Sequence, residues 1–278
     1  MGGKLVLIAT PIGNLGDITQ RAASALAAAD VVVAEDTRRT AVLLDHLGVR
    51  KPLWSFFEGN QLSRQRQILT ALREGTTVAL VSDAGSPLIS DPGYELVFAC
   101  LNEELPVEAL PGPCAAILAL QLSGLPPDRF TFEGFLPRKG PARRERLDSY
   151  RRLGGTLILY ESPNRVHETL ADVLATIGDA SCAVLREMTK LYEEALRGPL
   201  SYVMEKLAGR EIKGEVTIVV RLPKPQPAEL AEAISGARRL KRDLGLKTKD
   251  AAAAAALLLD ADKKAIYRAL ATEADPGD

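Results

Sequence analysis

The first 120 residues alternate short apolar runs with longer segments of helical spacing. Each apolar run is continuous, rich in branched residues and stopped by proline, glycine or aspartate, which is typical of buried strands. The runs are Leu5–Ala9, Val31–Ala34, Val78–Ser82 and Val107–Leu110, with a weaker one at Leu53–Phe56. Helical spacing marks Ile18–Ala29, Arg38–Leu47, Leu62–Arg73, Tyr94–Glu103 and the region near Ala115–Leu122. Repeated strand–helix units with short joints predict a parallel sheet covered by helices on both faces.

A second α/β segment follows the irregular stretch Ser123–Asp128, whose glycine and prolines break regular structure. Its predicted strands are Thr156–Tyr160, Cys182–Arg186 and Val216–Arg221, with a helix at Asn164–Ile177 and a further edge strand at Glu194–Gly198. We therefore place a domain boundary between residues 123 and 124.

The end of the chain has a different character. Three prolines alternate along Leu222–Ala228, as in a stiff extended linker. Residues 229–278 are rich in alanine and predict three short helices, with breaks near Gly245 and Asp260. The predicted fold class is thus α/β, with two α/β/α domains (1–123, with a mostly parallel sheet, and 124–222), a linker (223–228) and a small helical extension (229–278).

Composition narrows the class of protein. Hydrophobic residues make up 46% and charged residues 26%, as in ordinary globular chains, and no apolar run approaches the roughly 20 residues that span a bilayer. The amino terminus lacks the features of a secretory signal, so we expect a cytoplasmic protein that does not contact membranes. Three scattered cysteines and two histidines, His46 and His167, argue against disulfides and metal clusters, so no metal is expected.

Three loops leave predicted strand ends with unusual composition: Thr10–Asp17, Ser82–Gly93 and Pro111–Ala115. Ligands of open parallel sheets bind beyond the carboxyl ends of the strands, and glycine and proline fix backbone groups there in tight turns. Any one loop could be ordinary turn chemistry, but three at one edge predict a binding cleft. The loops contain neither a P-loop nor a Gly-x-Gly-x-x-Gly fingerprint, which excludes the common nucleotide sites.

Four motifs resemble the tetrapyrrole methylase superfamily, over roughly residues 4–222 and in the same order. They are ATPIGNLGDI (9–18), AEDTRR (34–39), SDAGSPLISDPG (82–93) and YESPNR (160–165). The resemblance, strongest to members that modify ribosomal RNA, implies a class III methyltransferase that folds S-adenosylmethionine into a cleft between two α/β domains. It further implies a homodimer and 2′-O-methylation of a decoding-centre cytidine in 16S rRNA, on free rRNA or on the small ribosomal subunit.

The resemblance also implies which positions hold the methyl donor. They are Pro11 from the first loop, Asp83, Ala84, Gly85, Ser86 and Ile89 from the second, Cys114 and Ala115 from the third, and Tyr160, Glu161 and Met188 from the second domain. Cys114 and Ala115 depart from a Ser/Thr pair common in the family, so a hydroxyl contact is missing. A core role for Met188 is an equal alternative.

Methyl transfer from a sulfonium to a ribose hydroxyl needs alignment of the reacting atoms and gains from a base. Because histidine is nearly absent, carboxylates or lysine are the candidates. The catalytic candidates are Glu35, Asp36, Arg38, Glu161 and Lys190, each following a predicted strand end. The alternative is structural, since Asp36 with Thr37 could cap the helix that follows.

Charge is distributed unevenly. Residues 1–136 carry 10 basic and 15 acidic side chains, residues 137–228 carry 16 and 12, and residues 229–278 carry 9 of each. Basic residues concentrate in Arg138–Arg152 and Arg238–Lys249, as phosphate neutralisation requires, although a charge run is usually a solvated face. The predicted RNA contacts are Arg138, Lys139, Arg143, Arg144, Arg146, Arg238, Arg239 and Lys241.

Two alternatives stay open at this point. A methyltransferase of the same superfamily could act on a small tetrapyrrole or a protein side chain, although two basic stretches favour a large anionic substrate. A non-catalytic RNA-binding module could retain the cleft as scaffolding, and it would then fail to bind S-adenosylmethionine.

Overall fold

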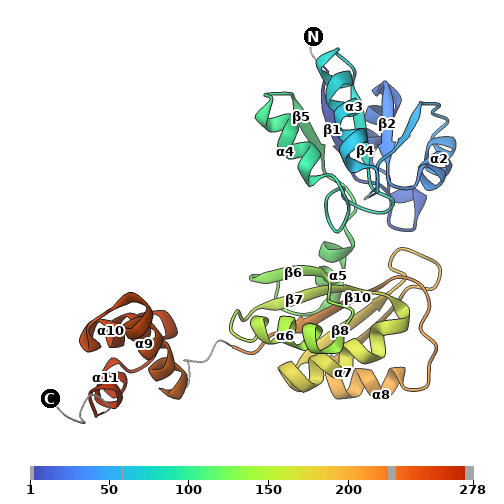
Figure 1. Cartoon of the computed structure of the whole chain (residues 1–278). Helices are drawn as coiled ribbons and strands as arrows, with labels where there is room; N and C mark the ends of the chain where they lie inside the picture. Colours follow the sequence, from blue (N-terminus) through green and yellow to red (C-terminus); the bar gives the residue numbers. More distant parts are fainter. Residues whose placement is uncertain (1–2, 58, 225–229, 273–278) are drawn as a thin grey trace. The chain divides into compact units, whose positions relative to one another are not determined.

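The computed structural model describes residues 3–57, 59–224 and 230–272, which divide between two compact units, 1–223 and 224–278 (Figure 1). The first unit contains both predicted α/β segments. Each segment forms its own five-stranded sheet. Residues 225–228 of the predicted linker (223–228), together with residue 229, lie outside the described residues.

The first sheet is wholly parallel, in the order β3-β2-β4-β1-β5. Its strands are β1 (Leu5–Ile8), β2 (Val31–Ala34), β3 (Leu53–Ser55), β4 (Val78–Val81) and β5 (Val107–Leu110). Every residue of β2 and β4 is buried, which explains their uninterrupted apolar runs. The weakest predicted strand is confirmed as β3 at the edge.

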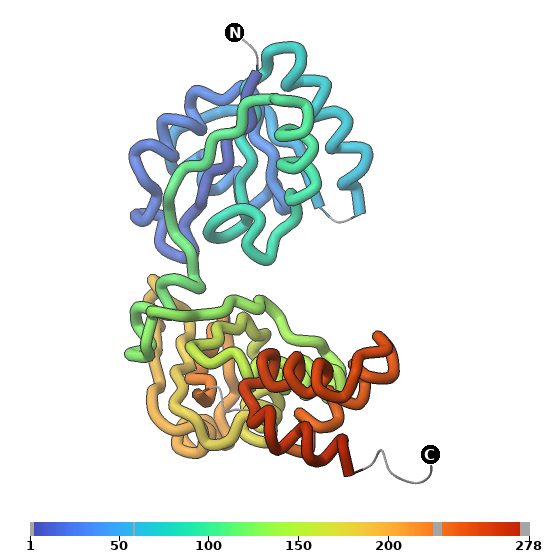
Figure 2. Tube along the Cα trace, turned by 90° about the vertical axis from the view of Figure 1, so that its left-hand side faces the viewer, coloured from blue at the N-terminus to red at the C-terminus, as the bar shows by residue number. Residues whose placement is uncertain are grey.

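Helices cover both faces of this sheet (Figure 2). They are α1 (Gln20–Ala28), α2 (Thr37–His46), α3 (Gln61–Arg73) and α4 (Tyr94–Asn102), with a short 3₁₀ turn, η1, at Leu15–Asp17. Leu26 of α1 and Leu43 of α2 share one core with Ile8, whereas Ile68 of α3 and Leu96 of α4 share the other. The carboxyl edge of the strands is thereby left to loops.

The second sheet has the order β6-β7-β10-β8-β9 and only its β6–β7 pair is parallel. Its strands are β6 (Phe130–Phe135), β7 (Thr156–Glu161), β8 (Ser181–Arg186), β9 (Glu194–Pro199) and β10 (Val216–Arg221). The sequence did not predict β6, because the register shift between Phe132 and Gly134 interrupts its alternation.

Helices also cover both faces of the second sheet. They are α5 (Ala115–Ser123), α6 (Gly140–Tyr150), the 3₁₀ turn η2 (Pro163–Arg165), α7 (Val166–Ile177) and α8 (Leu200–Leu207), of which α8 was not predicted. Leu147 of α6, Leu170 of α7 and Val203 of α8 form one core. On the other face, α5 packs through Ala119 and Leu120 against Ile158 and Val219. The predicted α/β/α layering is present in both halves of this unit.

The second compact unit is a three-helix cluster. Its helices are α9 (Leu230–Leu244), α10 (Thr248–Leu259) and α11 (Lys263–Thr272). Small side chains let the helices approach closely, with Ala233, Ala237, Ala252 and Ala255 in the core beside Ile266. The predicted breaks near Gly245 and Asp260 are confirmed, and Asp260 ends α10 in the left-handed conformation.

Within the described ranges, no set of three or more histidine, cysteine, aspartate and glutamate side chains is placed to hold a metal. No helix of those ranges is long and apolar enough to cross a membrane. Cys100 and Cys182 are buried as expected of small apolar residues, whereas Cys114 is partly exposed.

Candidate active site

The loop after β1 and the loop after β4 are joined by backbone pairing. The amide of Thr10 donates to the carbonyl of Gly85 at 2.9 Å, and the amide of Gly85 donates back to the carbonyl of Thr10 at 3.0 Å. The Thr10 hydroxyl also donates to the carbonyl of Ser82, at 2.9 Å. A third loop joins them, because the Ser86 hydroxyl donates to the carbonyl of Pro113 at 3.0 Å. The three loops singled out in the sequence therefore meet.

Glycine is required where these loops approach one another. Gly85 has φ +89°, and a Cβ there would lie 3.3 Å from Cγ2 of Ile12 and 3.5 Å from the carbonyl oxygen of Pro113. In the same loop Leu88 and Ser90 also have positive φ, 73° and 64°. Non-glycine residues held in this conformation cost free energy, and such strain gathers at ligand sites. Sequence reasoning did not select Thr10, although its place between a strand and a proline could have suggested it.

The predicted donor residues differ in exposure. Pro11 and Gly85 are buried, Asp83, Ala84, Ser86, Cys114 and Ala115 are partly buried, and Ile89 is 39% exposed. A groove of about 470 Å³ lies beside the first and third loops, lined in part by Ile12, Gly112, Cys114 and Thr189. Its size is in the range of small-molecule sites.

Tyr160 connects the second sheet to the third loop. Its hydroxyl accepts a hydrogen bond at 3.1 Å from the amide of Ala116 in the first turn of α5. An N-cap side chain would normally accept from this turn, but Cys114, the N-cap residue, makes no such bond. Tyr160 thus supplies the oxygen that the cysteine lacks. Burial raises the pKa of Tyr160 to about 12.

Met188 lies in the core and not in an open site. It is 7% exposed and belongs to the cluster of α5 and the second sheet that also includes Ile12. The structure therefore favours the alternative core role.

The five catalytic candidates have different surroundings. Asp36 caps α2, accepting from the amide of Arg38 at 2.9 Å and from the same guanidinium at 3.0 and 2.7 Å. The hydrogen bond from Arg38 lowers the pKa of Asp36 to about 2. A carboxylate with so low a pKa is a weak proton acceptor, so Asp36 and Arg38 fit the capping alternative.

Glu35 precedes Asp36, and much of its side chain is exposed to solvent. Its pKa is shifted in the opposite direction, upwards. Partial burial raises its pKa, and repulsion from Asp83 and Asp91 raises it further, against attraction from Arg39. Burial also raises the pKa of Asp91, which accepts a hydrogen bond from the Ser82 hydroxyl. A carboxylate with a raised pKa is the better general base near neutral pH.

Lys190 is held as a cation. Its Nζ lies 2.9 Å from Glu187 Oε1 and 3.0 Å from Glu215 Oε2. Burial alone would lower its pKa, but these hydrogen bonds outweigh burial and raise it. The aliphatic part of the side chain crosses Gly13, where a Cβ would lie 2.5 Å from Lys190 Cγ. Lys190 therefore joins the first loop to the segment after β8 and does not suit the role of base.

Glu161 is enclosed, with a side chain only 1% exposed. Its Oε1 accepts from the amide of Ser162 at 2.7 Å and its Oε2 from the hydroxyl of Thr169 at 2.6 Å. It also pairs with Arg165. Both carboxylate oxygens of Glu161 accept hydrogen bonds from groups inside the protein. This arrangement does not suit the predicted role of Glu161 as base and donor contact.

The predicted RNA contacts divide sharply. Arg143 is buried, with 4% of its side chain exposed, and pairs with Asp172, so its prediction as a surface contact is wrong. Arg144 pairs with the same Asp172 at 3.0 Å, and Arg146 forms two hydrogen bonds with Glu133. Arg138 and Lys139 are exposed, and neither side chain has a charged partner among the described residues. In the helical unit, Arg238, Arg239 and Lys241 are exposed on α9.

Comparison with known proteins agrees with this architecture. The family model described as "Tetrapyrrole (Corrin/Porphyrin) Methylases" matches residues 4–203. The chain belongs to the tetrapyrrole methylase family. A relative from Escherichia coli O157:H7 named ribosomal RNA small subunit methyltransferase I is 44% identical over 272 residues, which are 96% of this chain and 94% of the relative. A relative of the same name from Thermotoga maritima is 48% identical over 218 residues, 78% of this chain and 98% of its own length.

Solved structures share the fold at low identity. A diphthine synthase matches with a TM-score of 0.63 and 14% identity, over 81% of this chain and 92% of that one. A uroporphyrin-III C-methyltransferase from Thermus thermophilus, in complex with S-adenosylhomocysteine, matches with a TM-score of 0.56 and 18% identity, over 79% and 97%. In this family S-adenosylmethionine is the methyl donor.

The loop geometry predicts the effect of filling the space above Gly85. Gly85→Val should weaken S-adenosylmethionine binding at least about tenfold in calorimetry, because its side chain would push against Ile12 and Pro113. Gly48→Val is the matched control, since Gly48 also has positive φ (+67°) but no other group within 4 Å of where its Cβ would lie. Both variants should lose a similar roughly 1–3 kcal/mol of unfolding free energy from backbone strain. Equal donor affinity in the two variants would exclude this loop from the donor site.

Proposed function

We propose that this chain is an S-adenosylmethionine-dependent methyltransferase that acts on the RNA of the small ribosomal subunit. The observation that carries the proposal is the 41–48% identity, over most of the chain, to proteins named ribosomal RNA small subunit methyltransferase I. The uroporphyrin and diphthine enzymes share only 14–22% identity with this chain. This contrast disfavours a tetrapyrrole or protein side chain as the substrate.

The finer proposal is 2′-O-methylation of a decoding-centre cytidine in 16S rRNA, by a cytoplasmic homodimer. It rests on the resemblance of the four motifs. For the homodimer, an exposed apolar face of α4 adds support, since Tyr94, Phe98 and Leu101 are 67%, 54% and 60% exposed. Contiguous apolar surface of this kind marks interaction sites.

The residues present fit the proposed donor. S-adenosylmethionine carries a positive sulfonium, and three carboxylates gather after β2 and β4: Asp83 and Asp91 raise the pKa of Glu35, and Asp83 also raises that of Asp91. The mutual hydrogen bonds of Thr10 and Gly85, and the close approach of Gly85 to Ile12 and Pro113, fix the three loops beside one another, as a donor site built from loops requires. When bound, the donor supplies an electrophilic methyl group for in-line displacement.

The residues of this chain supply orientation and a proton acceptor. The paired loops fix the groups that hold the donor, so that alignment contributes to the rate. Glu35 accepts the proton of the attacking hydroxyl, because it is exposed and its pKa is raised, whereas the pKa of Asp36 is lowered and Glu161 is enclosed. Asp83 holds the Glu35–Asp36 segment in place, since its Oδ1 accepts from the amide of Asp36 at 2.8 Å.

Glu35→Gln tests the base. The variant should lose about 10²–10⁴-fold in kcat, the usual contribution of a general base, and a much smaller factor in donor affinity, because two of the three carboxylates remain. In the wild type the rate should fall as acid protonates Glu35. Because the pKa of Glu35 is raised, this fall should begin at a higher pH than for an ordinary glutamate. Asp36→Asn is the control and should keep the acid limb of the profile. If the pH–rate profile of Glu35→Gln keeps the acid limb of the wild type, another residue is the base.

The substrate is tested with radiolabelled S-adenosylmethionine and small ribosomal subunits from a strain that lacks this protein. Ribose methylation blocks alkaline cleavage, so label should appear in 16S rRNA within an alkali-resistant dinucleotide. Label in alkali-sensitive nucleotides would overturn 2′-O-methylation. Donor binding without labelled RNA would favour the small-molecule or protein substrate, and absence of donor binding would favour a non-catalytic RNA-binding module.

The homodimer is tested by light scattering after gel filtration. The expected mass is twice the 29.9 kDa of one chain, and a single-chain mass at micromolar concentration would contradict it.

A further inference from the structure

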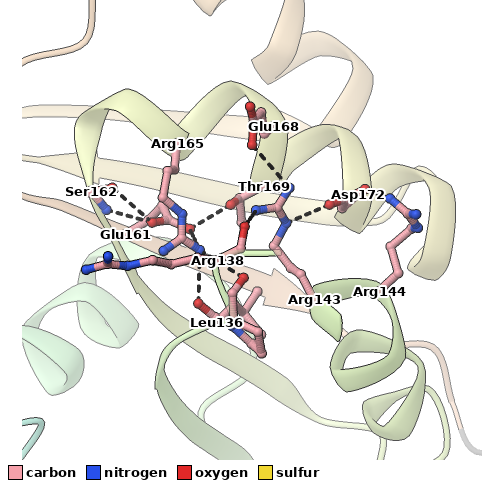
Figure 3. Close-up of polar contacts among 11 residues, drawn as sticks. Leu136, Arg138, Arg143, Arg144, Glu161, Ser162, Arg165, Glu168, Thr169 and Asp172 are labelled. Carbon is pink, nitrogen blue, oxygen red and sulfur yellow. Dashed lines mark hydrogen bonds and ion pairs between the residues drawn. The ribbon is translucent and has the colours of Figure 1, made fainter. Parts of the chain in front are cut away.

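The loop from β6 to α6 is held by its backbone carbonyls. Nη2 of Arg165 donates to the carbonyl of Leu136 at 2.9 Å and to that of Pro137 at 3.2 Å. Nη1 of Arg143 donates to the next carbonyl, that of Arg138, at 3.3 Å. Three successive carbonyls are thus bound by two guanidinium groups that converge on the loop from η2 and α6 (Figure 3).

Each of these guanidinium groups is anchored by a carboxylate. Nε of Arg143 lies 2.6 Å from Asp172 Oδ2 on α7, and Nη2 of Arg165 lies 3.3 Å from Glu161 Oε2 at the end of β7. Thr169 on α7 fixes Glu161 in turn. Two pairs, Arg143–Asp172 and Arg165–Glu161, therefore tie the loop to the strand and helix beside it.

Stability alone is a weak reason for such pairs. Removing two charges from water costs free energy that their attraction barely repays, so apolar residues of similar volume would often stabilise the protein as well or better. Buried polar groups of this kind can instead specify one conformation of the backbone that they bind. Here that backbone leads directly to Arg138 and Lys139.

The β6–α6 loop carries a local excess of positive charge. Arg143, Arg144 and Arg165 are matched by Glu161, Asp172 and Glu168, each of which forms an ion pair within the network. Arg138 and Lys139 are the remaining cations. Both are exposed, and no acidic side chain of the described residues pairs with either.

We propose that the pairs Arg165–Glu161 and Arg143–Asp172 are positioning residues for RNA binding: they fix the β6–α6 loop so that Arg138 and Lys139 meet RNA phosphates. The proposal rests on the proposed function and assigns Glu161 a role other than base or donor contact. A loop ordered before binding loses less conformational entropy when it binds, so its two cations contribute more to affinity.

The main test replaces one pair as a unit. Glu161→Gln/Arg165→Met removes both charges together and so leaves no buried charge unpaired. Binding and methylation of small ribosomal subunits are measured over a range of salt concentrations. We expect KM for the subunit to rise about tenfold, with kcat and the donor Kd unchanged. The slope of log K against log salt should fall by roughly 1.4–1.8, the value for two lost phosphate contacts.

A double-mutant cycle shows whether the pair acts through the loop. Arg138→Ala/Lys139→Ala, at two exposed positions, should give the same loss of salt slope without loss of stability. Combining it with the pair variant should cost no further affinity, because the cations that the pair positions are already gone. Additive losses would overturn the proposal. Arg73→Gln is the matched control, since its bidentate pair joins the end of α3 to Glu103, just after α4, and it should change neither slope nor KM.

Hydrogen exchange measures how well the loop is ordered in the absence of RNA. The amides of Arg138, Lys139, Gly140 and Ala142 should exchange faster in the pair variant, and unchanged exchange would overturn the positioning role. Faster exchange with an unchanged salt slope would overturn the role in RNA binding. If the pair variant does not fold, Thr169→Val is used instead, since it removes only the hydroxyl bond to Glu161. Failure of the proposed function looks different, because the wild type itself would then bind and label no 16S rRNA.

Discussion

Two backbone hydrogen bonds between Thr10 and Gly85 hold the candidate active site together. They join the ends of β1 and β4, which are neighbours in the parallel sheet, and Ser86 extends the link to the loop after β5. Because these bonds are made by the backbone, they depend on close approach and not on side-chain identity. Gly85 allows that approach, and Asp83 and Asp91 of the same loop lie close enough to Glu35 to raise its pKa.

The two sheets contribute opposite charge. The segments after β2 and β4 carry carboxylates, and the pKa values of two of them, Glu35 and Asp91, are raised. The β6–α6 loop carries two cations that pair with no acidic side chain of the described residues. An acidic donor site suits a sulfonium, and a basic loop suits a polyanion. In the function proposed here, charge separated in this way would let one protein bind a cationic donor and an anionic acceptor at different places.

Sequence patterns predicted the helices and strands correctly where a short stretch of residues is enough to specify the element. β1, β2 and β4 could be found because each is an almost wholly buried apolar run, and the helices between the strands because each buries one apolar face. The patterns also located β7, β8, β9 and β10 of the second sheet. They failed at β6, where a register shift interrupts alternation, and they did not give the order and direction in which the strands of the second sheet pair. Asp36 shows the intermediate case: its capping role was visible as an alternative, but only the contact with Arg38 decides it.

The sequence by itself determined that this is an α/β protein, that three loops leave strand ends with unusual composition, and which motifs link it to its family. These features are local, so a short window of residues contains them. Only the tertiary structure decided which charges are available. Arg143 and Arg138 belong to one basic run, yet one is buried against Asp172 and the other is exposed. Burial and ion pairing depend on residues 29 positions away, and no spacing within the run could reveal them.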